Sequence, residues 1–207
     1  MSSRPVSPGL KSLVMLLLAG ALAESAAAAS DCSSGLPPVW PPRFTIVQRK
    51  IPDNASLGMS TTVTYYDWAR GANLIVITPD ADPSAVLFDL ELNSRRSFYY
   101  TPSTNSCTPM SFPVGILRPD WLANATFLGR STRNGRPVLG WTKADFIDYY
   151  ADPVTCEPVS WYFHTMRARF DTVYMSVNAS VADLAMLLPP AYCNGTIGDS
   201  RGRAGAG

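Results

Sequence analysis

The residues best suited to chemistry are carboxylates two positions apart, and the first such pair is Asp80-Ala-Asp82. Two carboxylates at the end of a strand can hold the metal ion of a nucleotide-sugar enzyme. This pair directly follows the apolar run Leu74–Thr78. Pro79 and Pro83 bracket it, however, and Asp and Pro are typical turn residues. We therefore favour a tight turn over a metal-binding pair.

A second carboxylate pair, Asp89 and Glu91, lies in the alternating segment Val86–Leu92. Alternation places both side chains on one face of a strand. Two acids placed across a cleft can catalyse glycoside hydrolysis or transfer. A solvent-exposed strand face explains the same pattern, and we favour that interpretation.

The chain has one histidine, His164, so a Ser-His-Asp or Cys-His nucleophile would have to use it. It lies in the aromatic segment Trp161–Met166, which is typical of a strand, and a structural histidine is the simpler interpretation. A zinc site needs three or four His, Cys or acidic ligands, and the cysteines are expected to be oxidised. We expect no metal, no cofactor and no identifiable catalytic residue.

Three pairs of aromatic residues stand two positions apart, so the members of each pair share one face of a strand. Filling the core is the usual role of such pairs. A pocket for a small ligand is also lined mostly by apolar and aromatic side chains. The candidate ligand-lining residues are Tyr66, Trp68, Phe98, Tyr100, Trp161 and Phe163.

Short strands must position these residues, because 18 prolines and 14 glycines divide the chain into short segments. Phe146–Val177 is typical of three consecutive strands, and Asn134-Gly135 predicts a two-residue hairpin before them. We expect a turn at Thr104–Cys107, a helix or packed loop at Gly115–Asn124 and two helical turns at Val181–Leu188. The spacing predicts a mainly β fold, a single curved antiparallel sheet of about nine or ten strands with one or two short helices.

The amino-terminal residues indicate export. Arg4 and Lys11 precede the apolar run Leu13–Ala23, and small residues follow it. A bilayer span needs roughly 20 apolar residues, so this shorter run predicts a signal peptide over residues 1–29. We expect the curved sheet domain over residues 30–194 and a disordered, glycine-rich tail over residues 195–207.

Sequons and cysteines agree with a secretory route. An even number of cysteines in an exported chain predicts two disulfides, and four cysteines allow three connectivities. The cysteines are Cys32, Cys107, Cys156 and Cys193. N-glycosylation is expected at the four sequon asparagines, Asn54, Asn124, Asn178 and Asn194.

Charge and hydropathy argue against a nucleic-acid partner and against a transmembrane anchor. The formal net charge is +1 with no concentrated basic patch, so we expect no nucleic-acid partner. No second apolar run is long enough for a membrane helix, so we expect no transmembrane anchor in the mature chain. The product should be secreted or remain in the lumen of the secretory pathway.

Several motifs resemble those of a known group of proteins. They are Gly115–Leu122, the Asn134-Gly135 hairpin with Trp141, Phe146–Tyr150, Pro158–Phe163 and Pro190–Cys193. Over Trp40–Cys193 the chain resembles secreted plant and algal proteins of unassigned biochemistry. It is more distantly similar to ependymin-related secreted proteins, which share the LolA-like half-barrel of bacterial lipoprotein carriers. The resemblance implies a half-barrel whose concave side shelters an apolar ligand.

The same resemblance implies a disulfide pairing. Relatives often carry a cysteine in the hairpin at the position of Val138, whereas this chain has Cys156 in a neighbouring turn. That departure implies a Cys107–Cys156 bridge, with Cys32–Cys193 joining the two ends of the domain.

The leading hypothesis is a secreted, disulfide-linked glycoprotein that binds an apolar or amphipathic small ligand in the concavity of a curved sheet. One alternative is a carbohydrate-active enzyme that uses paired carboxylates for glycosyl transfer or hydrolysis. Another is a structural or adhesive extracellular component. We lean against an enzyme because no catalytic constellation stands out.

Overall fold

A computed structural model describes residue 32, residues 35–179 and residues 183–193. The expected signal peptide at 1–29 and the expected tail at 195–207 lie outside the described residues. Asn194, the asparagine of the fourth sequon, lies outside them as well.

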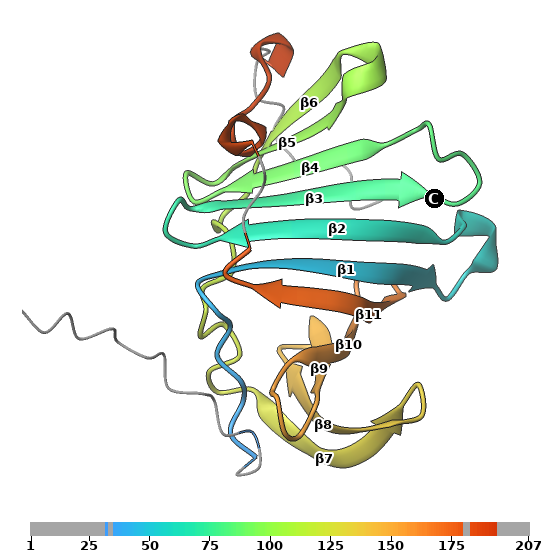
Figure 1. The fold of residues 1–207 in the computed structure, drawn as a ribbon, viewed down its shortest axis with the longest axis vertical. Helices are drawn as coiled ribbons and strands as arrows, with labels where there is room; N and C mark the ends of the chain where they lie inside the picture. The colour runs from blue at the N-terminus through green and yellow to red at the C-terminus, as the bar shows by residue number, and fades with distance from the viewer. Residues whose placement is uncertain (1–31, 33–34, 180–182, 194–207) are drawn as a thin grey trace, which may run out of the picture.

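Eleven strands form one open, curved antiparallel sheet (Figure 1). They are β1 (Arg43–Pro52), β2 (Ser60–Asp67), β3 (Ala72–Pro79), β4 (Leu87–Leu92), β5 (Arg96–Thr101), β6 (Ser106–Ser111), β7 (Thr126–Arg133), β8 (Arg136–Lys143), β9 (Ile147–Ala151), β10 (Pro158–Phe163) and β11 (Ala168–Val177). Their order is β6-β5-β4-β3-β2-β1-β11-β10-β9-β8-β7. The predicted fold class is confirmed, with eleven strands instead of nine or ten.

The additional strand is β6, where a turn was expected at Thr104–Cys107. It pairs with β5 from Ser106 to Ser111. Pro109 interrupts its apolar alternation, and proline lacks the N–H that an interior strand would donate. A proline is tolerated here because β6 is an edge strand.

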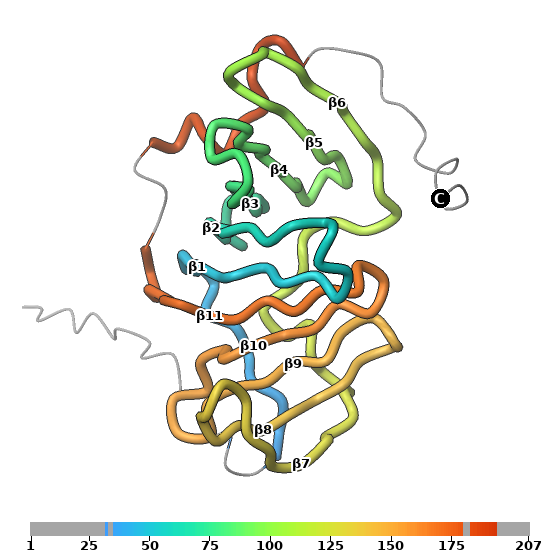
Figure 2. The backbone as a smooth tube through the Cα atoms, turned by 90° about the vertical axis from the view of Figure 1, so that its right-hand side faces the viewer, coloured from blue at the N-terminus to red at the C-terminus, as the bar shows by residue number. Residues whose placement is uncertain are grey.

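Two meanders make up the sheet. Strands β1 to β6 follow one another in space, as do β7 to β11, and β1 pairs with β11 in the middle. Figure 2 shows this succession from β6 at the top to β7 at the bottom. Residues 112–125 connect the two meanders without forming a strand, as expected for Gly115–Asn124.

We call the sheet face that carries Phe44, Tyr66 and Trp161 the inner face. On this face, from β8 through β11 to β2, lies a large aromatic core, and Trp40, Trp121 and Leu122 pack against it from the segments 35–42 and 112–125. Its buried members from the sheet include Phe44, Ile46, Tyr66, Trp141, Tyr149, Trp161 and Phe170.

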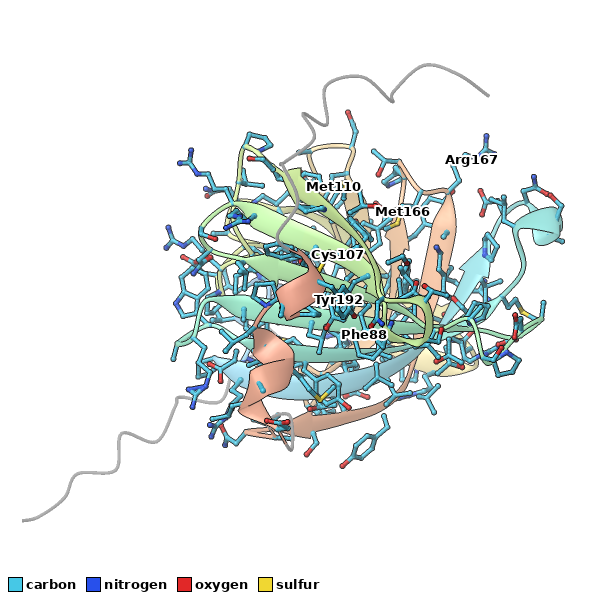
Figure 3. The ribbon with its side chains drawn as sticks, turned by 90° about the horizontal axis from the view of Figure 1, so that it is seen from above. Phe88, Cys107, Met110, Met166, Arg167 and Tyr192 are labelled. Atoms are coloured by element: carbon cyan, nitrogen blue, oxygen red, sulfur yellow. A yellow bond between two sulfur atoms is a disulfide. The ribbon has the colours of Figure 1, made fainter. Side chains whose placement is uncertain are left out.

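The opposite, outer face has its own core over β3 to β6, formed by Leu74, Leu90, Phe98 and Tyr100. The carboxyl-terminal 3₁₀ turns η4 (Leu184–Leu187) and η5 (Ala191–Cys193) cover it. Figure 3 shows Phe88, Cys107 and Tyr192 close to one another on this side.

The helical elements that connect and cover the strands are short. Besides η4 and η5 they include η2 (Ala55–Leu57) and η3 (Pro102–Thr104), both 3₁₀ turns. The helical turns expected at Val181–Leu188 are represented by η4 alone, since residues 181 and 182 lie outside the described part. Within the described residues, no helix has the length and apolar character needed to cross a membrane.

All four cysteines form disulfides, but the pairing implied by the resemblance, Cys107–Cys156 with Cys32–Cys193, is wrong. The bonds are Cys32–Cys156 and Cys107–Cys193, with Cα–Cα distances of 5.6 and 5.3 Å. Cys107 lies on the edge strand β6, whereas Cys156 lies in the turn between β9 and β10, across most of the sheet. A disulfide requires Cα atoms within about 7 Å, so each cysteine pairs with a partner from its own half.

Candidate functional site

A cluster of polar side chains lies on the inner face of β3, β4 and β5, beyond the aromatic core. We call the five residues Asn73, Asp89, Glu91, Ser97 and Tyr99 the acidic cluster. Asp89 and Ser97 are buried, with exposed fractions of 6% and 4%, and the other three are half-buried.

Strand register brings the cluster together. Glu91 on β4 stands opposite Asn73 on β3 and Ser97 on β5. Asp89 stands opposite Tyr99, two residues away on the same strands and therefore on the same face. Side chains directly opposite in an antiparallel pair have Cβ atoms roughly 5 Å apart, so the five residues form one contiguous patch.

Hydrogen bonds satisfy the cluster only in part. Asn73 Nδ2 donates to Glu91 Oε2 over 2.8 Å, and Tyr99 stands directly opposite Asp89. Two acceptors, Asp89 Oδ1 and Asn73 Oδ1, are inaccessible and have no hydrogen-bond partner among the described residues. A buried acceptor without a partner costs roughly 1–3 kcal/mol, so the cluster is ready to accept hydrogen bonds.

Desolvation controls the electrostatics of the cluster. Burial raises the pKa of Asp89, and the neighbouring Glu91 carboxylate raises it further, against a smaller opposing effect of the Tyr99 hydrogen bond. Burial raises the pKa of Glu91 as well, opposed by its hydrogen bond from Asn73. Burial also raises the pKa of Tyr99, with added contributions from both carboxylates. The preference for a solvent-exposed face at Asp89 and Glu91 was therefore wrong.

Three half-buried aliphatic side chains continue the inner face beside the cluster. Ile75 stands opposite Asp89, and one step further along the strands Ile77 stands opposite Leu87. We call Ile75, Ile77 and Leu87 the apolar strip; all three are partly accessible. The cluster and the strip together form an amphipathic surface on one face of β3 and β4.

The six aromatic candidates lie on both faces of the sheet. Tyr66 and Trp161 are buried in the aromatic core, and Trp68 and Phe163 pack against it half-buried. Phe98 and Tyr100 belong to the outer-face core. These residues therefore do not line one common cavity.

The aromatic core is densely filled where a hollow was expected. Trp161 stacks on Tyr149 with ring centroids 5.8 Å apart, and Trp40 packs edge-on against Phe44 and Tyr66. The Tyr66 hydroxyl donates to the carbonyl of Leu117 over 2.7 Å, which ties the segment 112–125 down onto β2.

One open depression lies at the strand ends beside this segment. Its volume is about 680 Å³, and Trp68 lines it together with Asn93, Arg95 and several residues of 113–124. Its basic groups are largely engaged, because Lys143 Nζ donates to the carbonyls of Trp121 and Ala123. Among the described residues, this depression has one buried polar atom without a hydrogen-bond partner, Trp121 Nε1, whereas the acidic cluster has two.

The other sequence candidates have structural roles. Asp80 is held by Arg49, whose Nη1 lies 2.8 Å from Asp80 Oδ1, and Asp82 accepts hydrogen bonds from the backbone and hydroxyl of Ser84. The Asp-x-Asp segment begins the connection between β3 and β4, in which a turn starts at Asp82, where the backbone N–H of Ala85 donates to the Asp82 carbonyl. His164 Nε2 lies 3.1 Å from Asp148 Oδ1 in the turn that follows β10, a satisfied structural histidine.

Three sequon asparagines, Asn54, Asn124 and Asn178, are exposed. The Asn54 side chain accepts hydrogen bonds from the backbone N–H and the hydroxyl of Ser56.

Sequence reasoning missed Asn73, Ser97 and Tyr99. A signal for Tyr99 exists in the alternation of Arg96–Thr101, which places Tyr99 on the face opposite to Phe98 and Tyr100. That it lies opposite Asp89 depends on the strand register, which the sequence does not reveal by alternation alone.

Residues 39–193 match the model of a protein family described as a domain of unknown function (DUF8395). The chain belongs to this family. No curated protein matches the chain. The predicted relationship to ependymin-related proteins and the predicted plant or algal origin stay predictions.

Two solved structures are similar to this chain. An uncharacterized conserved protein from Thermus thermophilus matches with a TM-score of 0.50 and 8% identity, over 76% of this chain and 90% of that chain. A LolA superfamily protein from Nitrosomonas europaea matches with a TM-score of 0.34 and 11% identity, over 73% of this chain and 92% of that chain. The first likeness concerns the fold alone, and the second is too weak to support an argument.

Proposed function

We propose that the protein binds an amphipathic small molecule on the inner face of β3 to β5. The polar head would meet the acidic cluster, and the apolar part would lie along the apolar strip. The observation that carries this proposal is the buried Asp89 with an unsatisfied carboxylate oxygen beside the partly accessible Ile75, Ile77 and Leu87. Convergent polar groups beside an apolar surface are typical of small-ligand sites.

The filled aromatic core supports this location over the concavity expected first. Trp40, Trp121 and Leu122 occupy the inner face of the other half, so a ligand there would have to displace packed side chains. Burial of the strip by a ligand contributes roughly 25 cal/mol for each Å² of apolar surface removed from water. The half-exposed strip is where that gain is still available.

Titration with 1-decanol, a neutral amphipathic probe, tests the proposal. We expect saturable binding to the full chain, weakened at least fivefold by Leu87→Ser because the variant removes apolar contact area. Val173→Ser is the matched control, since Val173 on β11 is 65% exposed and far from the strip in strand order. Equal weakening by both variants would contradict the proposed location.

Export and glycosylation belong to the proposed function. The exposure of Asn54, Asn124 and Asn178 and the two disulfides support a secreted glycoprotein. We expect N-glycosidase treatment of protein from the culture medium to lower its mass, and single Asn→Gln variants to remove one glycan each. A protein found only inside the cell and without glycans would contradict this part.

Glycoside chemistry is a second candidate, favoured by the raised pKa of Asp89, which suits a general acid. The two acids lie on one strand two residues apart, about 7 Å along the chain, instead of facing one another across a cleft. Hydrolysis of nitrophenyl glycosides that disappears in Asp89→Asn would support this candidate. Turnover unchanged by that variant would remove it.

A further inference from the structure

We propose that the polar head of the ligand is an organic cation, a protonated amine, held between Asp89 and Glu91. This inference rests on the proposed function and specifies the chemistry of its ligand. It is carried by two observations on the acidic cluster, namely its uncompensated negative charge and its unfilled hydrogen-bond acceptors.

Among the described residues, no cationic side chain forms an ion pair with Asp89 or Glu91. The titratable neighbour of the two acids is Tyr99 on β5, and Tyr66 on β2 stands opposite Asn73. Asp120, which lies near Tyr66, is paired with Arg118 over 2.9 Å. The nearby Arg96 lies over the ring of Phe98, 5.0 Å from its centroid, and therefore on the outer face. Buried carboxylates are normally paired with a cation or a metal, so the missing partner is a positive charge.

Other carboxylates of the protein differ from Asp89 because they have basic partners. Asp80 pairs with Arg49, Asp152 with Arg136 and Asp171 with Arg169. These three acids have basic partners although they are more exposed than Asp89. Asp67, which is as deeply buried as Asp89, also has a basic partner in Arg70. Asp89 is therefore the buried acid without a protein counter-charge among the described residues.

The unpaired hydrogen-bond acceptors of the acidic cluster favour an ammonium group over other polar head groups. Asp89 Oδ1 and Asn73 Oδ1 are both acceptors without partners in the described part of the chain. An ammonium group offers three donors and no acceptor, which complements two carboxylates and an amide oxygen. A carboxylate or phosphate head would be repelled, and a hydroxyl offers a single donor.

Binding of a cation should depend on pH in a defined direction. The pKa of Asp89 is raised by burial and by Glu91 to about 7, so Asp89 gains charge as the pH rises through neutrality. An alkylamine stays protonated below about pH 10, as lysine does. Capture should therefore strengthen with rising pH, and acidification should release the ligand by protonating the acids.

Three probes with the same ten-carbon chain test the inference: decylamine, 1-decanol and decanoate. Titration calorimetry on the full chain at pH 8 should show decylamine binding at least tenfold tighter than decanol and decanoate binding weakest. At pH 5.5 the advantage of the amine over the alcohol should fall below threefold. Equal affinity for amine and alcohol at pH 8 would overturn the inference and leave the proposed function standing.

The absence of saturable binding for all three probes would overturn the proposed function itself. Displacement of decylamine by millimolar calcium chloride, with calcium binding alone at the same site, would also overturn the inference in favour of an inorganic cation.

Two variants test whether the amine binds at the acidic cluster. Asp89→Asn and Glu91→Gln should each remove at least fivefold of the amine affinity at pH 8, and this loss should exceed the loss of decanol affinity in the same variant. Glu157→Gln is the matched control, because it removes one exposed acid from the turn before β10 and should change neither affinity. Loss of amine affinity in the control as well would show a general charge effect and contradict the assignment to the cluster.

Discussion

The two halves of the inner face have opposite character although they belong to one continuous sheet. Around β8 to β11 the inward positions are aromatic, and the segments 35–42 and 112–125 cover them. On β3 to β5 the inward positions carry an acidic cluster beside aliphatic residues, and most of them stay partly accessible. The comparison shows that one half of this face is filled by packed aromatic side chains and that the other half keeps polar and aliphatic side chains partly accessible.

The outer face shows the reverse distribution. Over β3 to β6 it carries the apolar core that η4 and η5 cover, whereas on β11 Val173 and Tyr174 are exposed. The main core therefore changes sides between β2 and β3, within the first meander. This leaves the acidic cluster on a surface that the fold does not need for its main hydrophobic packing.

The largest effect should come from Trp141→Ala in the filled half. Trp141 is fully buried, and its Nε1 donates to the Gly35 carbonyl over 3.0 Å. Removing it leaves a cavity, and we expect a loss of about 3–5 kcal/mol in the free energy of unfolding. Urea denaturation with intact disulfides measures it, with the exposed Tyr174→Ala as control; similar losses in both would contradict the role of the core.

The next largest effects should come from the two disulfides, because each one lies in a different half of the sheet. Replacing Cys32 and Cys156 by Ser should cost about 2–4 kcal/mol of unfolding free energy, since the bridge restricts the unfolded chain. It should loosen the amino-terminal segment over the aromatic core, whereas replacing Cys107 and Cys193 should release η5 from the outer face. Hydrogen exchange locates each effect, and peptide mapping without reduction that recovers Cys107 linked to Cys156 would contradict the pairing.

Asp89→Asn, in the half of the inner face that carries the acidic cluster, should have a smaller effect. It should raise the free energy of unfolding instead of lowering it. The pKa of Asp89 is raised from 3.8 to about 7, so between these values the folded protein binds more protons than the unfolded chain. The free energy of unfolding of the ligand-free protein must then decrease as the pH rises from about 4 to about 7. Asp89→Asn should reduce this decrease and stabilise the protein at pH 8 by at least about 1 kcal/mol.

Urea denaturation at pH 5 and pH 8 checks this prediction. Asp80 and Asp152 have lowered pKa values because of their hydrogen bonds and arginine partners. Both are ionised in the folded and unfolded states across this range, so their contributions stay constant. Greater stability at pH 8 than at pH 5 in the wild-type protein would contradict the buried state of Asp89.

The smallest effect should follow from Asp80→Ala, which removes an exposed ion pair with Arg49. Exposed ion pairs are screened by water and contribute little to stability. The urea midpoint should therefore shift less than in Asp89→Asn at pH 8. A larger shift would show that exposure is a poor guide to the roles of these two acids.

Prediction from the sequence was most successful for local features. The strands on both sides of Asn134-Gly135 follow from turn chemistry and side-chain alternation, which act over a few residues. The strand β6 was missed because Pro109 breaks the alternation. The acids at positions 89 and 91 were correctly placed on one face, but their burial was not anticipated.

The sequence by itself determined the mainly β fold, most strand positions and the side chains that share a face within each strand, because these depend on a period of two along the chain. Only the tertiary structure decided which cysteines pair, which face each half buries and which side chains stand beside Asp89. Those outcomes depend on the register between strands and on segments that cross the sheet from distant parts of the chain. Alternation carries no information about either, so the same pattern yields a packed core in one half and a partly accessible, polar and aliphatic surface in the other.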